Sequence, residues 1–369
     1  MKFLCSIFIL FCSVVTSVAA QNDSIEKVHK GNFFKGVGKA FGKVMKAISP
    51  DFDTLYIEPQ KYSFTVMAQG TQTYDHFILK SGDVDLGDIY SLDLAPDSKT
   101  SIGPYLGWQW IFLGYSFNVK TMNVSKHEFD INASFYTPSL GIDVVYRNLG
   151  SDYYLRDLRI GSIKDVRPFK DMRVEGLDID VMALNIYYVL NPKKYSHQAV
   201  YNQTNRQIRS AGSWIVGSGF SKNSYALDWD GFHRQIQQVS HSNERFFPND
   251  STLFFDKISY TSIPLTFGYG YNWTFSKNWC AAAQALASLS YMWTHGDAKE
   301  NSFTLKNMIK EMSFSNFTFD GSLRLGIVWN NTRWFAGANM VYHTFNYRNE
   351  HLSAYNIFGT MHLYVGYNF

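Results

Sequence analysis

The chain has 369 residues, of which 46% are hydrophobic, 17% aromatic and only 18% charged. So many aromatic side chains and so few charges exclude an intrinsically disordered protein, and 9 prolines with unpatterned glycines exclude a collagen-like repeat. A net charge of +3, from 34 basic and 31 acidic residues, is too small for a protein that neutralises many phosphates, so we expect no nucleic-acid partner.

Residues 1–20 have the pattern of a secretory signal peptide. A basic start at Lys2 precedes an apolar run, Phe3–Val15, that is too short to span a bilayer comfortably, and small residues lead to an expected cleavage after Ala20. An uncleaved membrane anchor and a lipoprotein signal stay open as alternatives. Cleavage would leave Cys280 as the single cysteine of the mature chain, so we expect no internal disulfide and another source of stability.

Residues 21–58 are expected to form an N-terminal periplasmic segment of basic character. Between residues 30 and 48, apolar side chains recur at helical spacing. The lysines that lie largely on the other face are Lys35, Lys39, Lys43 and Lys46. This pattern predicts a short amphipathic helix that contacts the anionic surface of the outer-membrane lipid. The alternative is a helix that packs on the body of the protein, with its lysines in water.

From Tyr62 onward the hydrophobic period changes from that of a helix to that of a strand. In residues 128–135, Phe129, Ile131, Ala133 and Phe135 share one face, and polar side chains occupy the other. We predict about fourteen strands in residues 59–369. Their ranges are 62–70, 73–80, 88–95, 99–107, 109–119, 126–136, 138–148, 174–190, 209–221, 257–274, 278–293, 316–330, 332–345 and 355–369.

The connections between these strands alternate in length. Those near 108, 136–137, 275–277 and 330–331 are tight, and those at 149–173, 222–256, 294–315 and 346–353 are long. In chain order, the tight turns fall at one end of the sheet and the long loops at the other, as in a transmembrane barrel. The connections at 120–125 and 191–208 fit this rule less well, and an extra strand pair inside 191–208 would change the count.

The alternation favours a bilayer over water. The apolar face of the strands is bulky and capped by aromatic residues, and the other face carries glycine, serine, asparagine and a few charges, which suits lipid outside and a polar lumen inside. We therefore predict an all-β fold, a closed antiparallel transmembrane β-barrel with an even strand number of about 12 to 14. A secreted, soluble all-β binding protein is the competing interpretation.

The C-terminal segment adds an independent argument. Tyr367 and Phe369 end a strand with apolar residues at every second position, which resembles the assembly signal of bacterial outer-membrane barrels, although Tyr364 stands where that signal has glycine. The resemblance implies that the barrel assembly machinery binds the last strand.

Several glycine-aromatic strings resemble an uncharacterised family of outer-membrane barrels from Bacteroidetes-type bacteria, the domain of unknown function 4421. The similar stretches are Asp53–Pro59, Gly103–Tyr115, Gly141–Arg147, Arg209–Ser213 and Phe267–Trp273. The resemblance covers nearly the whole mature chain. It implies a barrel in the cell outer membrane, and it brings no activity, cofactor or catalytic residue with it.

Charges within strands are the best functional candidates, because a basic residue on the lipid face near mid-bilayer costs about 2–4 kcal/mol. Seven of them are expected to face the lumen: Asp130, Asp143, Arg147, Asp178, Asp180, Asp320 and Arg324. They could bind a polar solute or a proton, or they could form an internal salt-bridge network that plugs a narrow barrel. We favour the second interpretation.

Signals for an enzyme are weak. No zinc-protease, nucleophile-elbow or phosphate-loop motif is present, and the histidines show no metal-ligand spacing, so we expect no catalytic residue, metal or cofactor. An alternative enzyme would be a lipid acyl hydrolase that pairs a strand serine with His343 or His362. The loop at 222–256 could recognise an extracellular ligand or fold inward and cap the barrel. The sequence thus predicts a non-catalytic outer-membrane barrel with a role in transport, surface binding or envelope structure.

Overall fold

A computed structural model describes residues 51–59, 61–83, 88–108, 111–114, 117–119, 129–149, 153–159, 169–241, 257–295, 316–348 and 352–369. These residues belong to the compact unit Ile48–Phe369, which is distinct from a unit formed by Met1–Ala47. The predicted signal peptide and the amphipathic helix with its four lysines lie outside the described residues.

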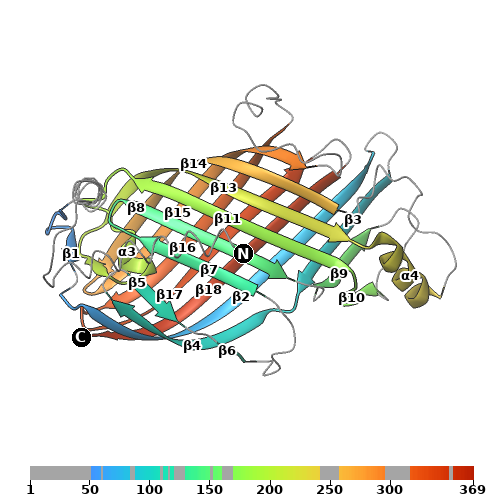
Figure 1. The fold of residues 1–369 in the computed structure, drawn as a ribbon. Helices are drawn as coiled ribbons and strands as arrows, with labels where there is room; N and C mark the ends of the chain where they lie inside the picture. Colours follow the sequence, from blue (N-terminus) through green and yellow to red (C-terminus); the bar gives the residue numbers. More distant parts are fainter. Residues whose placement is uncertain are drawn as a thin grey trace, which may run out of the picture. The chain divides into compact units, whose positions relative to one another are not determined.

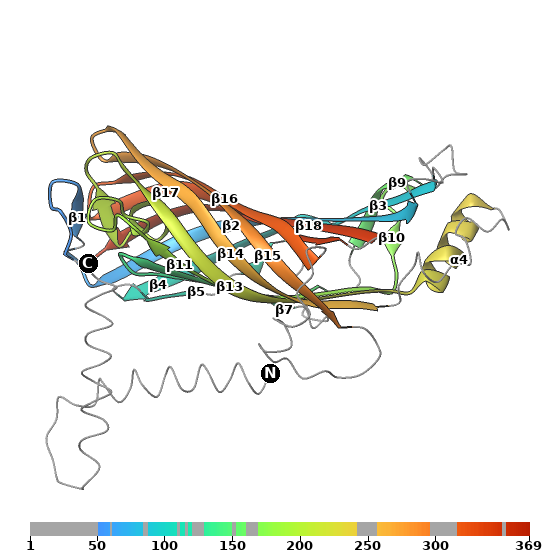
Figure 2. The same cartoon turned by 90° about the horizontal axis from the view of Figure 1, so that it is seen from above.

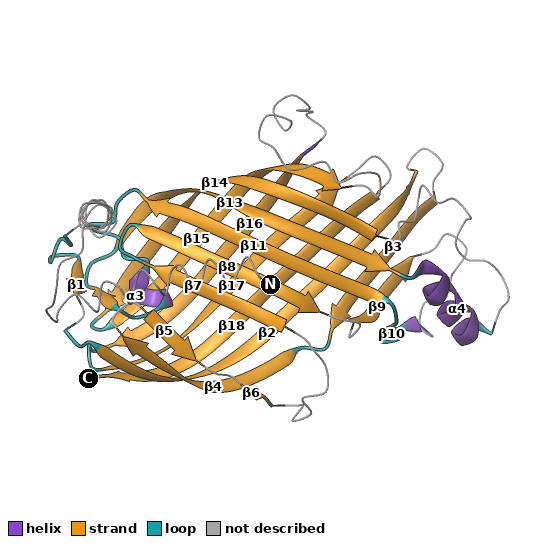
Figure 3. Ribbon diagram, viewed as in Figure 1, coloured by secondary structure: helices purple, strands orange, loops and turns teal. Residues whose placement is uncertain are grey.

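The described chain is built almost entirely of strands (Figure 1, Figure 3). Neither of its two helices is long and apolar enough to cross a membrane. The elements, in chain order, are β1 (Ile57–Pro59), β2 (Phe64–Asp83), β3 (Asp88–Pro96), β4 (Lys99–Trp108), β5 (Ile111–Gly114), β6 (Phe117–Asn118), β7 (Phe129–Tyr136), β8 (Leu140–Leu149), β9 (Tyr153–Arg159), β10 (Arg173–Val174), β11 (Leu177–Val189), α3 (Gln198–Tyr201), β12 (Asn205–Gln207), β13 (Ala211–Leu227), α4 (Trp229–Ser240), β14 (Lys257–Ser276), β15 (Trp279–His295), β16 (Phe317–Asn330), β17 (Trp334–Arg348) and β18 (Leu352–Asn368).

One antiparallel sheet of 16 strands contains nearly all of them. Its main path runs β10-β9-β3-β2-β18-β17-β16-β15-β14-β13-β11-β8-β7, and β4 pairs with β2, β5 and β6. The first and last long strands are neighbours, because the N–H of Phe64 donates to the carbonyl of Phe369 at 3.1 Å. Figure 2 shows the sheet curling, with β13 and β14 passing across the strands behind them.

The structure differs from the prediction at two pairs of strands. Ranges 62–70 and 73–80 are a single strand, β2, which runs without a break through Gly70–Thr73. Strands β3 and β4 lie end to end along β2, with Phe77 opposite Leu94 and Thr73 opposite Lys99. The predicted closure is not seen: within the described residues, the main hydrogen-bonded path ends at β7 and at β10, and the branch through β4 ends at β5 and β6.

The strands present the two faces that the sequence predicts. From Leu265 to Phe275 the odd-numbered side chains of β14 are exposed, Leu265 at 69% and Trp273 at 57%, whereas Asn272 on the other face is fully buried. The same inversion is seen on β16, where Phe319 is 74% exposed and Arg324 is 2% exposed. Bulky apolar rows therefore face outward, and polar side chains are enclosed by the curled sheet.

The connection at 191–208, which we call the plug segment, folds into the enclosed side of the sheet. It contains α3 and β12, and β12 pairs with β1 rather than with the wall strands. Two wall glycines leave space for the plug segment. A Cβ on Gly326 would lie 2.5 Å from Val200, and a Cβ on Gly270 would collide with the Tyr195 hydroxyl. The extra strand pair considered for this connection is thus one strand, paired with β1, together with one turn of helix.

Candidate functional site

A buried ion pair joins opposite sides of the curled sheet. Arg324 on β16 donates through Nη2 to the Asp143 carboxylate on β8, and the side chains are 2% and 3% exposed. Along the sheet these strands are separated by β15, β14, β13 and β11, so the pair forms only because the sheet curves round. A buried pair of this kind holds the two walls in register, since separating it leaves uncompensated charge.

Aromatic rings surround the guanidinium of Arg324. Its Cζ lies 5.8 Å from the ring centroid of Tyr136, 5.6 Å from that of Tyr187 and 6.0 Å from that of Tyr201, and Nη1 donates to the Tyr136 hydroxyl. Tyr136 and Tyr187 come from the wall, and Tyr201 comes from the plug segment. Three ring faces stabilise the buried cation, so the tyrosines add to the compensation of the Arg324 charge by Asp143.

The plug segment contributes a histidine to the same cluster. His197 packs with ring centroids 4.7 Å from Tyr136 and 4.9 Å from Tyr201, and its Nε2 lies 3.3 Å from the Tyr187 hydroxyl. Burial, together with the positive charge of Arg324, holds the pKa of His197 well below its usual value. The imidazole is therefore neutral at pH 7, and the cluster contains one cation rather than two.

A cavity of about 40 Å³ lies beside the ion pair. Its polar lining comes from Asp143, Asn185, Ser221, Ser262, Thr266, Ser288, Asp320, Ser322, His343 and Thr344. A space of this size holds a few water molecules and excludes an organic solute. Water in the cavity can therefore hydrate the buried polar groups that line it.

Hydrogen bonds fix the plug segment to the wall on several sides. The Asn272 Nδ2 donates to the Ser196 carbonyl at 2.7 Å, and the Gln198 Nε2 donates to the Tyr136 carbonyl at 2.7 Å. On β18, the Tyr364 hydroxyl accepts from Gln203 Nε2 at 2.7 Å. Polar contacts from three strands therefore close this end of the sheet with plug residues.

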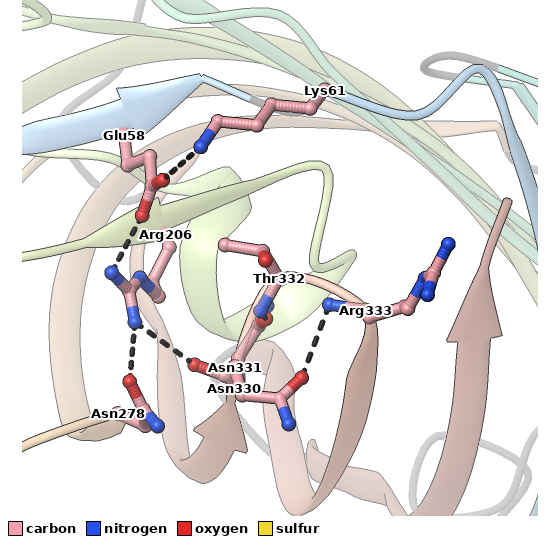
Figure 4. A network of polar contacts seen from close by, with 8 residues as sticks. All are labelled: Glu58, Lys61, Arg206, Asn278, Asn330, Asn331, Thr332 and Arg333. Atoms are coloured by element: carbon pink, nitrogen blue, oxygen red, sulfur yellow. Dashed lines mark hydrogen bonds and ion pairs between the residues drawn. The ribbon is translucent and has the colours of Figure 1, made fainter.

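A second network ties β1 and β12 to the turns of the wall (Figure 4). Arg206 Nη2 lies 2.6 Å from the Glu58 carboxylate, while Nη1 donates to the Asn278 side chain and, at 3.5 Å, to the Asn330 carbonyl. Lys61 lies 3.0 Å from the same carboxylate. Burial opposes ionisation of Glu58, but hydrogen bonds and positive charge from Lys61 and Arg206 outweigh it and lower its pKa. Glu58 is thus a charged anchor at neutral pH.

The opposite end of the enclosed space is apolar. A cluster of buried side chains fills it: Phe77, Leu79, Leu92, Leu94, Val145, Tyr153, Leu155, Leu158, Phe169, Val174, Leu177, Ile179, Val181, Ala183, Tyr225, Leu227, Phe232, Ile236, Tyr260, Met292, Phe345, Tyr347, Ala354 and Phe358. Helix α4 joins it through Phe232 and Ile236, one turn apart, and starts at Asp228, whose side chain accepts from the Gly231 N–H at 2.9 Å. The described part of loop 222–256 therefore packs inward.

The seven charged residues predicted to face the lumen lie in different environments in the structure. Asp143 and Arg324 meet in the buried ion pair. Asp320 is on the enclosed face, where its carboxylate accepts from Ser290 Oγ at 2.5 Å and from the Asn346 N–H at 2.8 Å. Asp130 and Arg147 are directly opposite each other on β7 and β8.

The prediction was wrong for Asp178 and Asp180. On β11 the buried residues are Leu177, Ile179 and Val181, so the two aspartates share the outward face. They lie at the end of the strand where the interior is apolar and water is available outside, so a charge on the outward face costs little there.

The proposed assembly residues belong to an outward aromatic cluster. The Phe369 ring stacks on Phe64 with ring centroids 5.9 Å apart, and the ring centroids of Tyr367 and Trp334 are 4.7 Å apart. The two histidines considered for an acyl hydrolase have other contacts. His362 Nδ1 lies 2.9 Å from both Gln69 Nε2 and Thr71 Oγ1, and the His343 ring stacks on Phe358 at 5.2 Å. In the described residues, no serine is bonded to either ring, and no group of side chains could hold a metal ion.

Sequence reasoning missed the aromatic half of the cluster. Around Arg324, Tyr136, Tyr187 and His197 are buried and Tyr201 is half-buried. The wall tyrosines could have been found from the alternation of faces along a strand. Tyr187 lies on the same face as Asn185, which is opposite Asp143. Nothing in the sequence places residues 191–208 inside the sheet.

The geometry defines the class of protein. Strands such as β14 and β15 are long enough to cross a bilayer, their outward faces are apolar and aromatic, and ionic groups are enclosed. This is the fold of an outer-membrane β-barrel protein, and its location is the cell outer membrane. A family model described as Domain of unknown function (DUF4421) matches residues 51–369, and the chain belongs to this family.

Solved structures with a similar fold include several bacterial outer-membrane proteins. The outer membrane protease OmpT from Escherichia coli has a TM-score of 0.36 and 10% identity, over 86% of this chain and 99% of that one. The translocator domain of autotransporter NalP from Neisseria meningitidis has a TM-score of 0.29 and 10% identity, over 92% and 98%. For the outer membrane protein OprG from Pseudomonas aeruginosa the values are 0.22 and 11%, over 85% and 99%. No curated protein sequence matches the chain.

Proposed function

We propose that this protein is a closed, occluded and non-catalytic barrel with a structural or surface role in the outer membrane, rather than an open pore. The observation that carries the proposal is the filled interior. The plug segment occupies one end, the Arg324–Asp143 pair crosses the middle, and an apolar cluster fills the other end.

The barrel closes by pairing of β7 with β5 and β6. An unpaired strand edge is not stable in hydrocarbon, because every backbone group must find a partner there. With β3 and β4 counted as one wall strand, and β5 and β6 as another, the wall has twelve: β2, β3/β4, β5/β6, β7, β8, β11, β13, β14, β15, β16, β17 and β18. With an even number of antiparallel strands, the first strand begins and the last strand ends at the same end of the wall, as the contact between Phe64 and Phe369 requires.

Cysteine cross-linking tests the closure. Pairs placed along Ile111–Gly114 and Phe129–Tyr136, in a Cys280→Ala background, are expected to form disulfides at one register in folded protein. Matched pairs between Ile111–Gly114 and the outward face of β16 should not react. Absence of cross-links at every register would contradict a closed wall.

Conductance in planar bilayers tests the occlusion. Residues 21–369 are refolded into lipid, and a folded barrel is recognised by faster migration of the unheated sample on a gel. We expect folded protein to give no steady conductance steps, since the plug segment fills one end of the enclosed space and an apolar cluster fills the other. Steady, ohmic steps would overturn the occlusion. Identical migration before and after heating would overturn the barrel itself.

Incubation with phospholipid and lipopolysaccharide tests the absence of catalysis. Asp143 is engaged by Arg324, and neither His343 nor His362 is hydrogen-bonded to a serine among the described residues, so neither histidine activates a serine as a nucleophile in this arrangement. Thin-layer chromatography should therefore show no released acyl chain. Release that a His343→Ala or His362→Ala variant abolishes would establish the hydrolase instead.

The ends of the chain complete the proposal. Residues 1–20 act as a cleaved signal peptide, and residues 21–58 form a periplasmic segment whose lysines contact lipid. The last strand, with Tyr367 and Phe369, is bound by the barrel assembly machinery during insertion. N-terminal sequencing of the protein recovered from outer membranes should start at Gln21, and a start at Met1 would contradict cleavage.

A further inference from the structure

Exposed basic side chains gather at the plugged end of the wall. Lys193, Lys194, Arg209, Lys277 and Arg333 are all exposed in connections at this end. Among the described residues, the basic side chains that meet a carboxylate here are Lys61 and Arg206, and both bind Glu58. The five exposed cations thus form a basic rim, and none of them forms an ion pair with a carboxylate in the described part of the chain.

The rim lies directly beside outward aromatic side chains. Trp279 follows Lys277 by two residues and is 39% exposed, and Trp334 follows Arg333 and is 51% exposed. Tryptophan and tyrosine at such positions mark the boundary between hydrocarbon and headgroups on a membrane barrel. The cations next to them therefore stand at the height of the lipid phosphates.

Arg333 is oriented for an anion. Its Cζ lies 5.6 Å from the ring centroid of Tyr62 and 5.9 Å from that of Tyr367. The turn that carries it is fixed by Asn331, whose Oδ1 accepts from the backbone N–H of Arg333 at 3.1 Å and of Trp334 at 2.8 Å. Figure 4 shows the guanidinium directed away from Glu58 and Arg206. A guanidinium held by rings keeps its planar set of donors for a phosphate, which it binds bidentately.

We propose that the rim of Arg333 and Lys277, with Lys193, Lys194 and Arg209, binds the phosphates of phospholipids in the periplasmic leaflet and prefers anionic headgroups. This inference rests on the proposed barrel, because it needs the aromatic cluster to lie at the membrane boundary. Charge complementarity selects the ligand: each rim cation gains about 1 kcal/mol near an anionic surface, and the gain falls with salt.

Lipid retention tests the proposal. Folded protein is reconstituted in phosphatidylcholine with and without phosphatidylglycerol, and the lipids that stay bound are counted by native mass spectrometry. We expect the wild type to retain phosphatidylglycerol preferentially. Arg333→Gln and Lys277→Gln together should lower the ratio of retained phosphatidylglycerol to phosphatidylcholine by about fivefold per residue, and added salt should remove the preference.

Lys80→Gln is the matched control, since the Lys80 ammonium also lies over a ring, 5.6 Å from Tyr355, but at the opposite end of β2. An unchanged ratio in the double variant, or an equal loss in Lys80→Gln, would overturn the inference. Equal destabilisation of the Arg333 variant in both lipids would also overturn it, because ring stacking alone would then explain the arginine. Heat-dependent gel migration of each sample separates these outcomes from failure of the barrel.

Discussion

At the scale of single residues, Arg324 illustrates how a membrane barrel tolerates a charge in its interior. Desolvation of a guanidinium is costly, and here a carboxylate and three tyrosine rings compensate it together. The pair connects β16 with β8, so its contribution lies in joining distant strands as much as in its own energy.

Removing one partner of this pair should be strongly destabilising. Arg324→Met leaves the Asp143 carboxylate buried without a cation, and we expect a loss of about 3–5 kcal/mol in the free energy of unfolding. The double variant Arg324→Met/Asp143→Leu should recover most of that loss. Guanidinium-chloride titration in lipid vesicles measures both values.

Arg234→Met, on the exposed side of α4, is the control and should change stability by less than about 0.5 kcal/mol. A single Arg324→Met variant as stable as this control would show that the ion pair contributes nothing to the fold.

The predicted charges also show what the alternation of inward and outward residues along a strand can and cannot reveal. Asp143 and Arg324 were placed on the enclosed face because their strands alternate without interruption. For Asp178 and Asp180 the same expectation failed, since it assumed that every strand charge avoids the outward face, and this holds only at hydrocarbon depth. The depth of a residue depends on where its strand enters the membrane, which a single sequence does not show.

At the scale of elements, the long strands could be predicted because their hydrophobic period is local. The plug segment could not, since α3 has only four residues and forms where the surrounding wall supplies its partners. The end-to-end arrangement of β3 and β4 also depends on a distant partner, β2, rather than on residues 96–99 themselves.

Pairing of β1 with β12 should depend on pH through Glu58. Because the pKa of Glu58 is lowered in the folded state, its stabilising effect is complete above the usual glutamate value of 4.5 and is lost as the pH falls through the lower, folded value. Exchange of the Ile208 amide, which donates to the Tyr56 carbonyl at 2.7 Å where β1 meets β12, should therefore accelerate below that range in the wild type. Glu58→Gln should exchange quickly at every pH.

Glu175→Gln, an exposed residue before β11, should leave this profile unchanged. Exchange at Ile208 that shows the same pH profile in the wild type and in Glu58→Gln would contradict the assigned role of the carboxylate.

At the scale of the whole molecule, the inverted polarity explains how a chain with one cysteine in residues 21–369 is held together. The wall supplies its own backbone hydrogen bonds, the plug segment fills one end, and the lipid covers the apolar rows. The family name describes none of these features, so they have to be tested directly.

A charge on the outward face distinguishes lipid from water. Leu265 is 69% exposed near the middle of β14, and Leu265→Arg should cost about 2–4 kcal/mol in a bilayer. Leu55 is also exposed, at 60%, but it precedes the wall, so Leu55→Arg should change the free energy of unfolding by less than about 0.5 kcal/mol. Unfolding titrations in the same vesicles give both values, and equal effects would argue against a lipid-facing β14.

The most direct test of the inverted polarity is a nitroxide scan of β14 in lipid vesicles, from Ile263 to Tyr269 in a Cys280→Ala background. Labels at odd positions, whose native side chains are outward, should collide with oxygen dissolved in the bilayer, and labels at even positions should be shielded. If instead the odd positions collide with a water-soluble nickel complex and not with oxygen, the apolar rows of the wall face water, and the protein is not an inverted barrel in lipid.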